Sequence, residues 1–188
     1  MRRVLALCLL AAMPAAAQDP GEHCLAPAPG RDGCAAAELV ELREGPALEI
    51  RPAGGGTPVI LTLPPVPGAE MRPDPPGGVE IRLQTPWDGR FPEARRLTLG
   101  MGPDGPILLA LSVEVFDRAR GHGLACAFDW RRGAGRVEVS RADPEGLAED
   151  EVKRMEIRSA APPPDATPAR LLADPPGCAP GRRIFAGN

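Results

Sequence analysis

Short segments in which apolar and polar residues alternate recur along most of this chain. Residues 48–51, 79–84 and 136–140 are the most regular of them. An alternation with period two places the apolar side chains on one face of a β-strand and the polar side chains on the other. The 22 glycines and 25 prolines cluster between these segments and are nearly absent inside them. The pattern therefore predicts many short strands separated by turns.

Further strand candidates complete the predicted fold. They are residues 38–43, 59–63, 96–100, 107–116, 124–130 and 153–159. We expect an all-β, mainly antiparallel protein of about eight or nine short strands, arranged as a β-sandwich or a partly open β-barrel with little helix. Residues 107–116, 124–130 and 136–140 should form three consecutive antiparallel strands. Both the odd-numbered and the even-numbered residues of 107–116 are largely apolar. We therefore expect a central strand that is covered on both faces.

Two proline-rich stretches interrupt the strand pattern, at residues 64–76 and 160–168. Proline has no N–H to donate to a strand ladder, so neither stretch is expected in a central strand. We interpret the first as a long connection and the second as the end of the compact body. Asp143 followed by Pro144 predicts a short helical turn over residues 144–150, because proline is favoured at the first helical position.

The N-terminus has the layout of a secretory signal peptide. Arg2 and Arg3 precede an apolar run at residues 4–12, and small residues follow at 15–17. The run is about half the length that a membrane-spanning helix needs, so no transmembrane segment is expected after cleavage. The predicted organisation is a signal peptide at 1–17, an N-terminal disulfide loop at 18–35, a β domain at 36–160 and a Pro-rich C-terminal tail at 161–188.

Composition and charge indicate where the chain works and which partners it avoids. Lys153 is the only lysine among abundant arginine, alanine, glycine and proline, which is typical of a GC-rich bacterial genome. Together with the leader, this favours a periplasmic or secreted protein. Removing Arg2 and Arg3 leaves twenty basic residues against twenty-five acidic ones. That negative balance argues against nucleic acid as a partner.

Four cysteines remain after the leader, an even number in a chain that is expected to be exported. A Pro-Gly-rich turn separates Cys24 from Cys34, so we predict that these two form a disulfide, which leaves Cys126 to pair with Cys178. The second bond would fasten the C-terminal tail to the central sheet. No two cysteines have the close spacing of a zinc or haem site, and we expect neither a metal nor a cofactor.

The best binding candidates lie in two predicted turns. Trp87 and Phe91, two of only six aromatic residues, occur between predicted strands together with Arg90. Tryptophan and arginine are favoured at interface hot spots because they combine large contact area with directional bonding. His122 lies between two glycines in the turn after residues 107–116, where its imidazole could reach a ligand.

No nucleophile motif is present, so we assign no catalytic residue and expect that the chain is not an enzyme. The leading hypothesis is an exported, non-catalytic β-rich domain that binds a protein or a component of the cell envelope. One alternative is a periplasmic hydrolase that uses His122 or the carboxylates of Asp88 and Glu93. Another is a carrier in which a half-open barrel holds a small apolar ligand.

Overall fold

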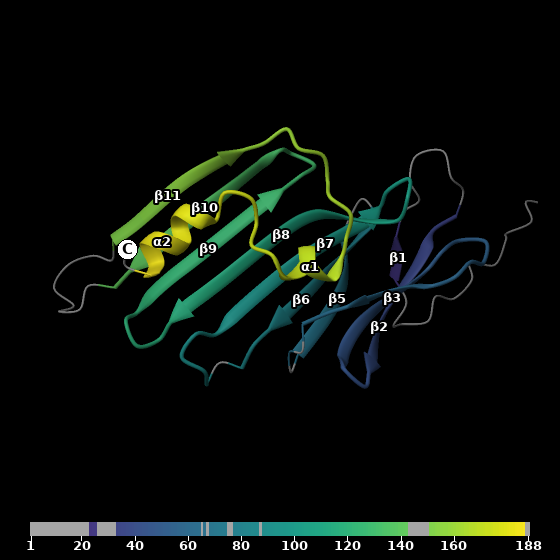
Figure 1. The fold of residues 1–188 in the computed structure, drawn as a ribbon, viewed down its shortest axis with the longest axis horizontal. Helices are drawn as coiled ribbons and strands as arrows, with labels where there is room; N and C mark the ends of the chain where they lie inside the picture. Colours follow the sequence, from purple (N-terminus) through teal and green to yellow (C-terminus); the bar gives the residue numbers. More distant parts are fainter. Residues whose placement is uncertain are drawn as a thin grey trace, which may run out of the picture.

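The computed structural model describes residues 23–25, 33–64, 66, 68–74, 77–86, 88–142 and 151–186. This part of the chain forms two antiparallel sheets and two short helices (Figure 1). Neither of these helices is long and apolar enough to cross a bilayer. The predicted signal peptide at 1–17 and the predicted helical turn at 144–150 lie outside the described residues.

The larger sheet has seven strands, each paired with its neighbour along the chain, in the order β11-β10-β9-β8-β7-β6-β5. Its strands are β5 (Gly68–Asp74), β6 (Gly78–Gln84), β7 (Glu93–Met101), β8 (Pro106–Asp117), β9 (His122–Asp129), β10 (Ala134–Arg141) and β11 (Glu151–Arg158). The three consecutive antiparallel strands predicted from the alternation are β8, β9 and β10, and their pairing is confirmed.

The smaller sheet has four strands in the order β1-β2-β3-β4. They are β1 (His23–Leu25), β2 (Ala35–Leu42), β3 (Gly45–Arg51) and β4 (Val59–Thr62). Both sheets stay open, and the prediction of an antiparallel, sandwich-like β fold with little helix is confirmed. The described residues contain eleven strands, more than the eight or nine expected, because β1 and β5 were not anticipated.

Strand β5 lies inside the proline-rich stretch 64–76, so the prediction that this stretch is only a long connection is wrong. The strand pairs with β6 alone and forms one edge of the larger sheet. Pro73 lacks an N–H, yet an edge strand tolerates proline because only one of its sides takes part in the ladder. A proline in this stretch is therefore compatible with a strand, provided that the strand lies at an edge of the sheet.

Strand β8 contains a bulge that explains why both of its parities are apolar. Thr98 of β7 lies opposite Ala110, whereas the next residue, Leu99, lies opposite Leu108. Leu109 is therefore the extra residue of the bulge. Across it the alternation of faces shifts by one residue, so that side chains an odd number of positions apart lie on the same face. In consequence Leu108 and Leu111 are both buried, at 1% and 2% exposure, despite their odd spacing.

The prediction that β8 is covered on both faces is accordingly corrected. One face of the larger sheet, here called the inner face, packs against the smaller sheet and the C-terminal segment. The opposite face, the outer face, carries Glu114 and Phe116 of β8, which are both exposed. The strand is central, as expected, because it is the fourth of the seven.

The main core lies between the two sheets. The smaller sheet contributes buried aliphatic side chains such as Leu25, Leu48 and Ile50, and the larger sheet contributes side chains of the inner face such as Ile81 and Leu97. These side chains are fully buried, at 0% exposure. The area that they remove from water is the main source of stability for an open sheet of this kind.

The C-terminal segment covers the part of the inner face that the smaller sheet leaves open (Figure 1). It carries α1 (Pro168–Leu172) and α2 (Ala179–Ala186). Helix α2 lies against β9 and β10, and a Cβ atom at Gly181 would fall 2.4 Å from Val137 Cγ1. Only glycine permits this close approach of helix and sheet.

A partly buried arginine and a disulfide fasten this segment. Arg95 of β7 donates from Nη1 to the carbonyl oxygens of residues 171–173, at the end of α1, over 2.8–3.3 Å. Cys178, immediately before α2, is bonded to Cys126 of β9. The other disulfide joins Cys24 to Cys34. Both predicted pairings are therefore present.

Candidate functional site

Two of the predicted binding residues lie in the loop between β6 and β7, at one end of the larger sheet. Phe91 is half exposed, and the guanidinium carbon of Arg90 lies 4.9 Å from the centroid of the Phe91 ring. This distance is within the range of a cation–π contact. Trp87 belongs to the same loop in the sequence but lies outside the described residues.

This loop is held against the turn that joins β8 to β9. The Arg118 amide donates to the Arg90 carbonyl oxygen over 3.1 Å, and the Phe116 amide donates to the Pro92 carbonyl oxygen over 3.2 Å. The side chain of Arg90 also reaches Asp117, with 3.6 Å between Nε and Oδ1. The structure thus brings the Arg90–Phe91 pair next to the turn that precedes His122.

Asp117 organises this junction. Its side chain is only 5% exposed, and the Ala119 amide donates to Oδ1 over 3.0 Å. Burial by itself would raise the pKa of Asp117, but the Ala119 amide and the positive charge of Arg90 outweigh burial. The pKa of this carboxyl therefore lies below its ordinary value, and Asp117 is a carboxylate at neutral pH.

Replacing Asp117 with asparagine is expected to make the free energy of unfolding fall less steeply as the pH is lowered into the acid range. A carboxyl whose pKa is lower in the folded state stabilises the fold above its unfolded pKa, and that contribution disappears as the pH falls through the folded pKa. The native chain should therefore lose stability below about pH 4 more steeply than Asp117→Asn does. Urea denaturation between about pH 2 and pH 6 measures this difference. Parallel profiles for the two proteins would contradict it.

His122 begins β9 and lies on the inner face, in register with Asp117 of β8 on one side and Arg141 of β10 on the other. Its Nδ1 atom is buried without a hydrogen-bond partner, and Arg141 donates from Nη2 to the Ile184 carbonyl oxygen of α2 over 2.6 Å. The histidine thus shares a sheet end with Arg90 and Phe91 but belongs to the face that α2 covers. Among the described residues, no three His, Cys, Asp or Glu side chains form a group that could hold a metal ion.

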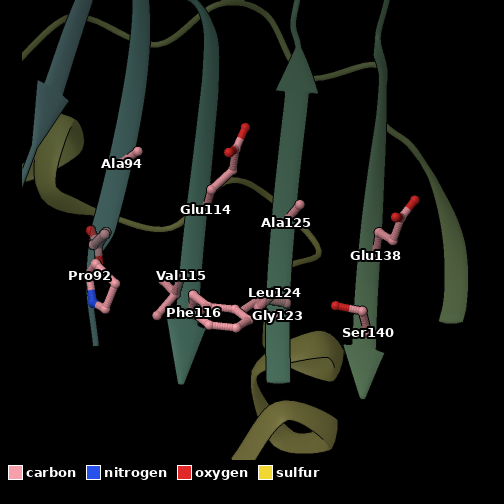
Figure 2. Close-up of a pocket in the computed structure, with 11 residues that line it drawn as sticks. Pro92, Ala94, Glu114, Val115, Phe116, Gly123, Leu124, Ala125, Glu138 and Ser140 are labelled. Atoms are coloured by element: carbon pink, nitrogen blue, oxygen red, sulfur yellow. The ribbon is translucent and has the colours of Figure 1, made fainter. Parts of the chain in front are cut away.

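The outer face contains a hollow that the sequence did not indicate. It has a volume of about 430 Å³ and lies over the ends of β7, β8, β9 and β10. Figure 2 shows the carboxylates of Glu114 and Glu138 on either side of Ala125, and the Phe116 ring lying toward Gly123. The remaining lining residues are Pro92, Glu93, Ala94, Val115, Leu124 and Ser140.

Small residues on β9 form the floor of this hollow. Gly123 lies opposite Phe116 of β8 and Ser140 of β10, and a Cβ atom at Gly123 would fall 2.5 Å from Ser140 Oγ and 3.9 Å from Phe116 Cδ2. A larger residue at position 123 would therefore fill the space beside the ring. Glycine keeps the hollow open and leaves Phe116 39% exposed.

The same strand leads to a second hollow of about 510 Å³ farther along the outer face. Its floor includes Ala127, and its sides carry charged groups of both signs, among them Arg136 and Glu156. The available sequence signal for both hollows is the size alternation along β9. Gly123, Ala125 and Ala127 alternate there with the buried side chains of Leu124, Cys126 and Phe128.

Fold and site together define an open, two-sheet antiparallel β protein with two disulfides and an exposed aromatic sheet end. Comparison with known proteins finds no matching family model, no similar curated protein and no similar solved structure.

Proposed function

We propose that this chain is an exported, non-catalytic binding domain whose ligand is another protein or a component of the cell envelope. The compartment that we propose is the bacterial periplasm or the exterior of the cell. The two disulfides, Cys24–Cys34 and Cys126–Cys178, support this location, because such bonds form and persist in oxidising compartments. The acidic balance of the sequence supports a partner other than nucleic acid.

The observation that carries the proposal is the exposed aromatic end of the larger sheet. Phe91 and Phe116 expose 50% and 39% of their surface, although phenylalanine is usually buried. They lie on segments joined by the Pro92 carbonyl, and Arg90 stacks on one of the two rings. Aromatic side chains and arginine are enriched at protein interfaces relative to the rest of the surface. A contact site at this end therefore accounts for the exposure.

A photo-crosslinking amino acid placed at position 116 is expected to capture the partner in native cell envelopes. The ring of Phe116 is exposed on the outer face, so a benzophenone at this position would touch whatever binds there. We expect a crosslinked adduct from position 116 and from position 91, detected by mass spectrometry of the affinity-purified chain.

Position 60 provides the matched control. Ile60 is 45% exposed on β4, in the smaller sheet, so the same probe there is accessible but lies away from the aromatic end. Adducts at 116 and 91 that are missing at 60 would support the proposal. The same set of adducts from all three positions, or none from any of them, would count against it.

The carrier alternative has one observation in its favour, which is the hollow beside Phe116. Its volume of about 430 Å³ falls within the range of small-ligand sites, and Pro92, Ala94 and Ala125 give it an apolar lining. A ligand there would lie on the outer face and not between the sheets, where side chains form the core. Native mass spectrometry of gently purified protein distinguishes the two roles, because a carrier should retain a bound small molecule.

The hydrolase alternative depends on His122 or on the carboxylates Asp88 and Glu93. The Glu93 carboxylate accepts a hydrogen bond from Arg95, the arginine that holds the end of α1, and so serves a structural contact. Asp88 is exposed in the loop before β7. This arrangement favours the binding role over paired-carboxylate chemistry, and unchanged activity after substitution of His122 and Asp88 would eliminate those residues from any reaction that is found.

A further inference from the structure

Strand β11 forms one edge of the larger sheet, and no other strand of the described residues pairs with its far side (Figure 1). Its eight residues pair with β10 without any shift of register. An edge strand of this kind presents a row of unpaired N–H and C=O groups to a further strand. We propose that two copies of this chain associate by antiparallel pairing of their β11 strands, with Met155 opposite Met155.

The other sheet edges among the described residues are poorly suited to this. Strand β5 contains Pro73, which cannot donate to a ladder, and the edge strands β1 and β4 have only three and four residues. Strand β11 is eight residues long and has neither proline nor glycine. Charged side chains can also protect an edge, so the arrangement of charges on β11 decides whether a second copy fits.

Two-fold symmetry restricts which charged residues of the two β11 strands can lie opposite each other. When two identical strands pair about a two-fold axis, outer-face residues of one copy meet outer-face residues of the other. An axis through Lys153, Arg154 or Glu156 would place each of these charges opposite itself. An axis through Met155 places Arg154 opposite Glu156 at two symmetric positions and a neutral side chain at the centre. Opposite charges directly across a sheet are stabilising and like charges are destabilising.

The extent of pairing points to the same register. With the axis at Met155, residues 152–158 of the two copies lie opposite one another, whereas an axis at Val152 or Ile157 leaves only three residues of β11 paired. Among the registers with an uncharged residue at the axis, the one centred on Met155 thus has the longest overlap, and it also has complementary charges.

Both charged partners have the capacity for these contacts. Arg154 uses Nε for an ion pair with Glu138, at 2.9 Å, which leaves its two terminal nitrogens for Glu156 of a second copy. The Arg154 side chain is 64% exposed, and Glu156 is exposed as well. Pairing at this edge would continue the larger sheet from one copy into the next and place both outer faces on the same side. The inference is independent of the proposed function.

Charge reversal tests the register. The purified, oxidised chain should be a concentration-dependent dimer by sedimentation equilibrium between about 1 and 500 µM. Arg154→Glu and Glu156→Arg should each weaken self-association about tenfold or more, because like charges then face each other twice. An equimolar mixture of the two variants should associate again, since each glutamate then meets an arginine. Arg72→Glu, an exposed arginine on the opposite edge strand β5, is the matched control and should leave the dimer unchanged.

A cysteine at position 155 provides a second readout. Residues directly opposite each other in an antiparallel pair have Cα atoms about 4.5–5.5 Å apart, which is within disulfide range. Met155→Cys should therefore form a covalent dimer on mild oxidation. Val152→Cys, on the same strand, should not, because the two copies of position 152 would lie about 20 Å apart.

Three results would overturn the proposal. The first is a single-chain mass throughout the concentration range. The second is a dimer that Arg154→Glu and Glu156→Arg leave equally tight, with no recovery on mixing. The third is crosslinking at position 152 that is as efficient as at position 155. Thermal unfolding of each variant, compared with the native chain, shows that any loss of dimer is not a loss of fold.

Discussion

Replacing Cys126 and Cys178 together with alanine is expected to lower the free energy of unfolding by about 4 kcal/mol. The bond spans 52 residues, and a link across so long a segment removes more chain entropy from the unfolded state than a short one does. It is also the covalent connection between β9 and the start of α2. We therefore expect helix α2, and with it the cover over Val137 and Val139, to be the first structure lost.

The Cys24–Cys34 pair serves as the control. Its sequence separation is 10 residues, for which the same reasoning gives about 2.7 kcal/mol. Urea denaturation of the two double-alanine variants tests the order of the effects, and hydrogen exchange locates the loss. Equal destabilisation by the two changes, or continued protection of residues 179–186 without the Cys126–Cys178 bond, would contradict the expectation.

Close packing at Gly181 holds the C-terminal segment in addition to the Cys126–Cys178 disulfide. A Cβ atom there would also fall 2.9 Å from Leu124 Cδ1, so helix and sheet are in direct contact over β9 and β10. Arg95 adds three hydrogen bonds at the end of α1. The C-terminal segment is therefore held to the sheet at three places, by packing at Gly181, by hydrogen bonds from Arg95 and by the disulfide at Cys178. These contacts explain how a proline-rich stretch stays packed against the inner face.

The features that the sequence revealed are those that depend on local pattern. Alternation located the strands, and the even cysteine count with a turn between Cys24 and Cys34 was enough to predict both pairings. The bulge at Leu109 was not predictable in this way. Apolar residues at both odd and even positions fit a strand covered on both faces as well as a bulged strand, and only the pairing of β7 with β8 distinguishes the two. Proline hid β5 for a related reason, since residue type alone does not tell an edge strand from a loop.

The hollow on the outer face was missed because its residues meet only across strands. Glu114, Ala125 and Glu138 are far apart in the sequence, and the registers of β8, β9 and β10 place them in one row. Arg90 and Phe91, which the sequence predicts as binding residues, lie exposed in the loop before β7. That they lie beside Asp117, and that His122 belongs to the inner face, follows from the register of β8 and β9. Sequence pattern thus predicts which side chains leave the core, while pairing decides which of them meet.

Phe128 is expected to be the most sensitive single position, with Phe128→Ala lowering the free energy of unfolding by about 4 kcal/mol. The side chain is 1% exposed and meets Trp130 edge to face, with 5.1 Å between the ring centroids. It lies opposite Gly135 of β10, where a Cβ atom would fall 2.6 Å from Phe128 Cδ2. Because Gly135 has no side chain, it cannot fill the cavity that alanine would leave on this side of the ring.

Phe128→Leu tests whether volume is the cause. Leucine fills most of the same space, so this variant should lose only about 1–1.5 kcal/mol in the same urea denaturation measurement. A loss below about 1 kcal/mol for Phe128→Ala would mean that β9 and β10 close over the cavity. Equal losses for alanine and leucine would assign the effect to the edge-to-face contact with Trp130. The expected difference between the two variants instead reflects a ring whose volume replaces the side chain that Gly135 lacks.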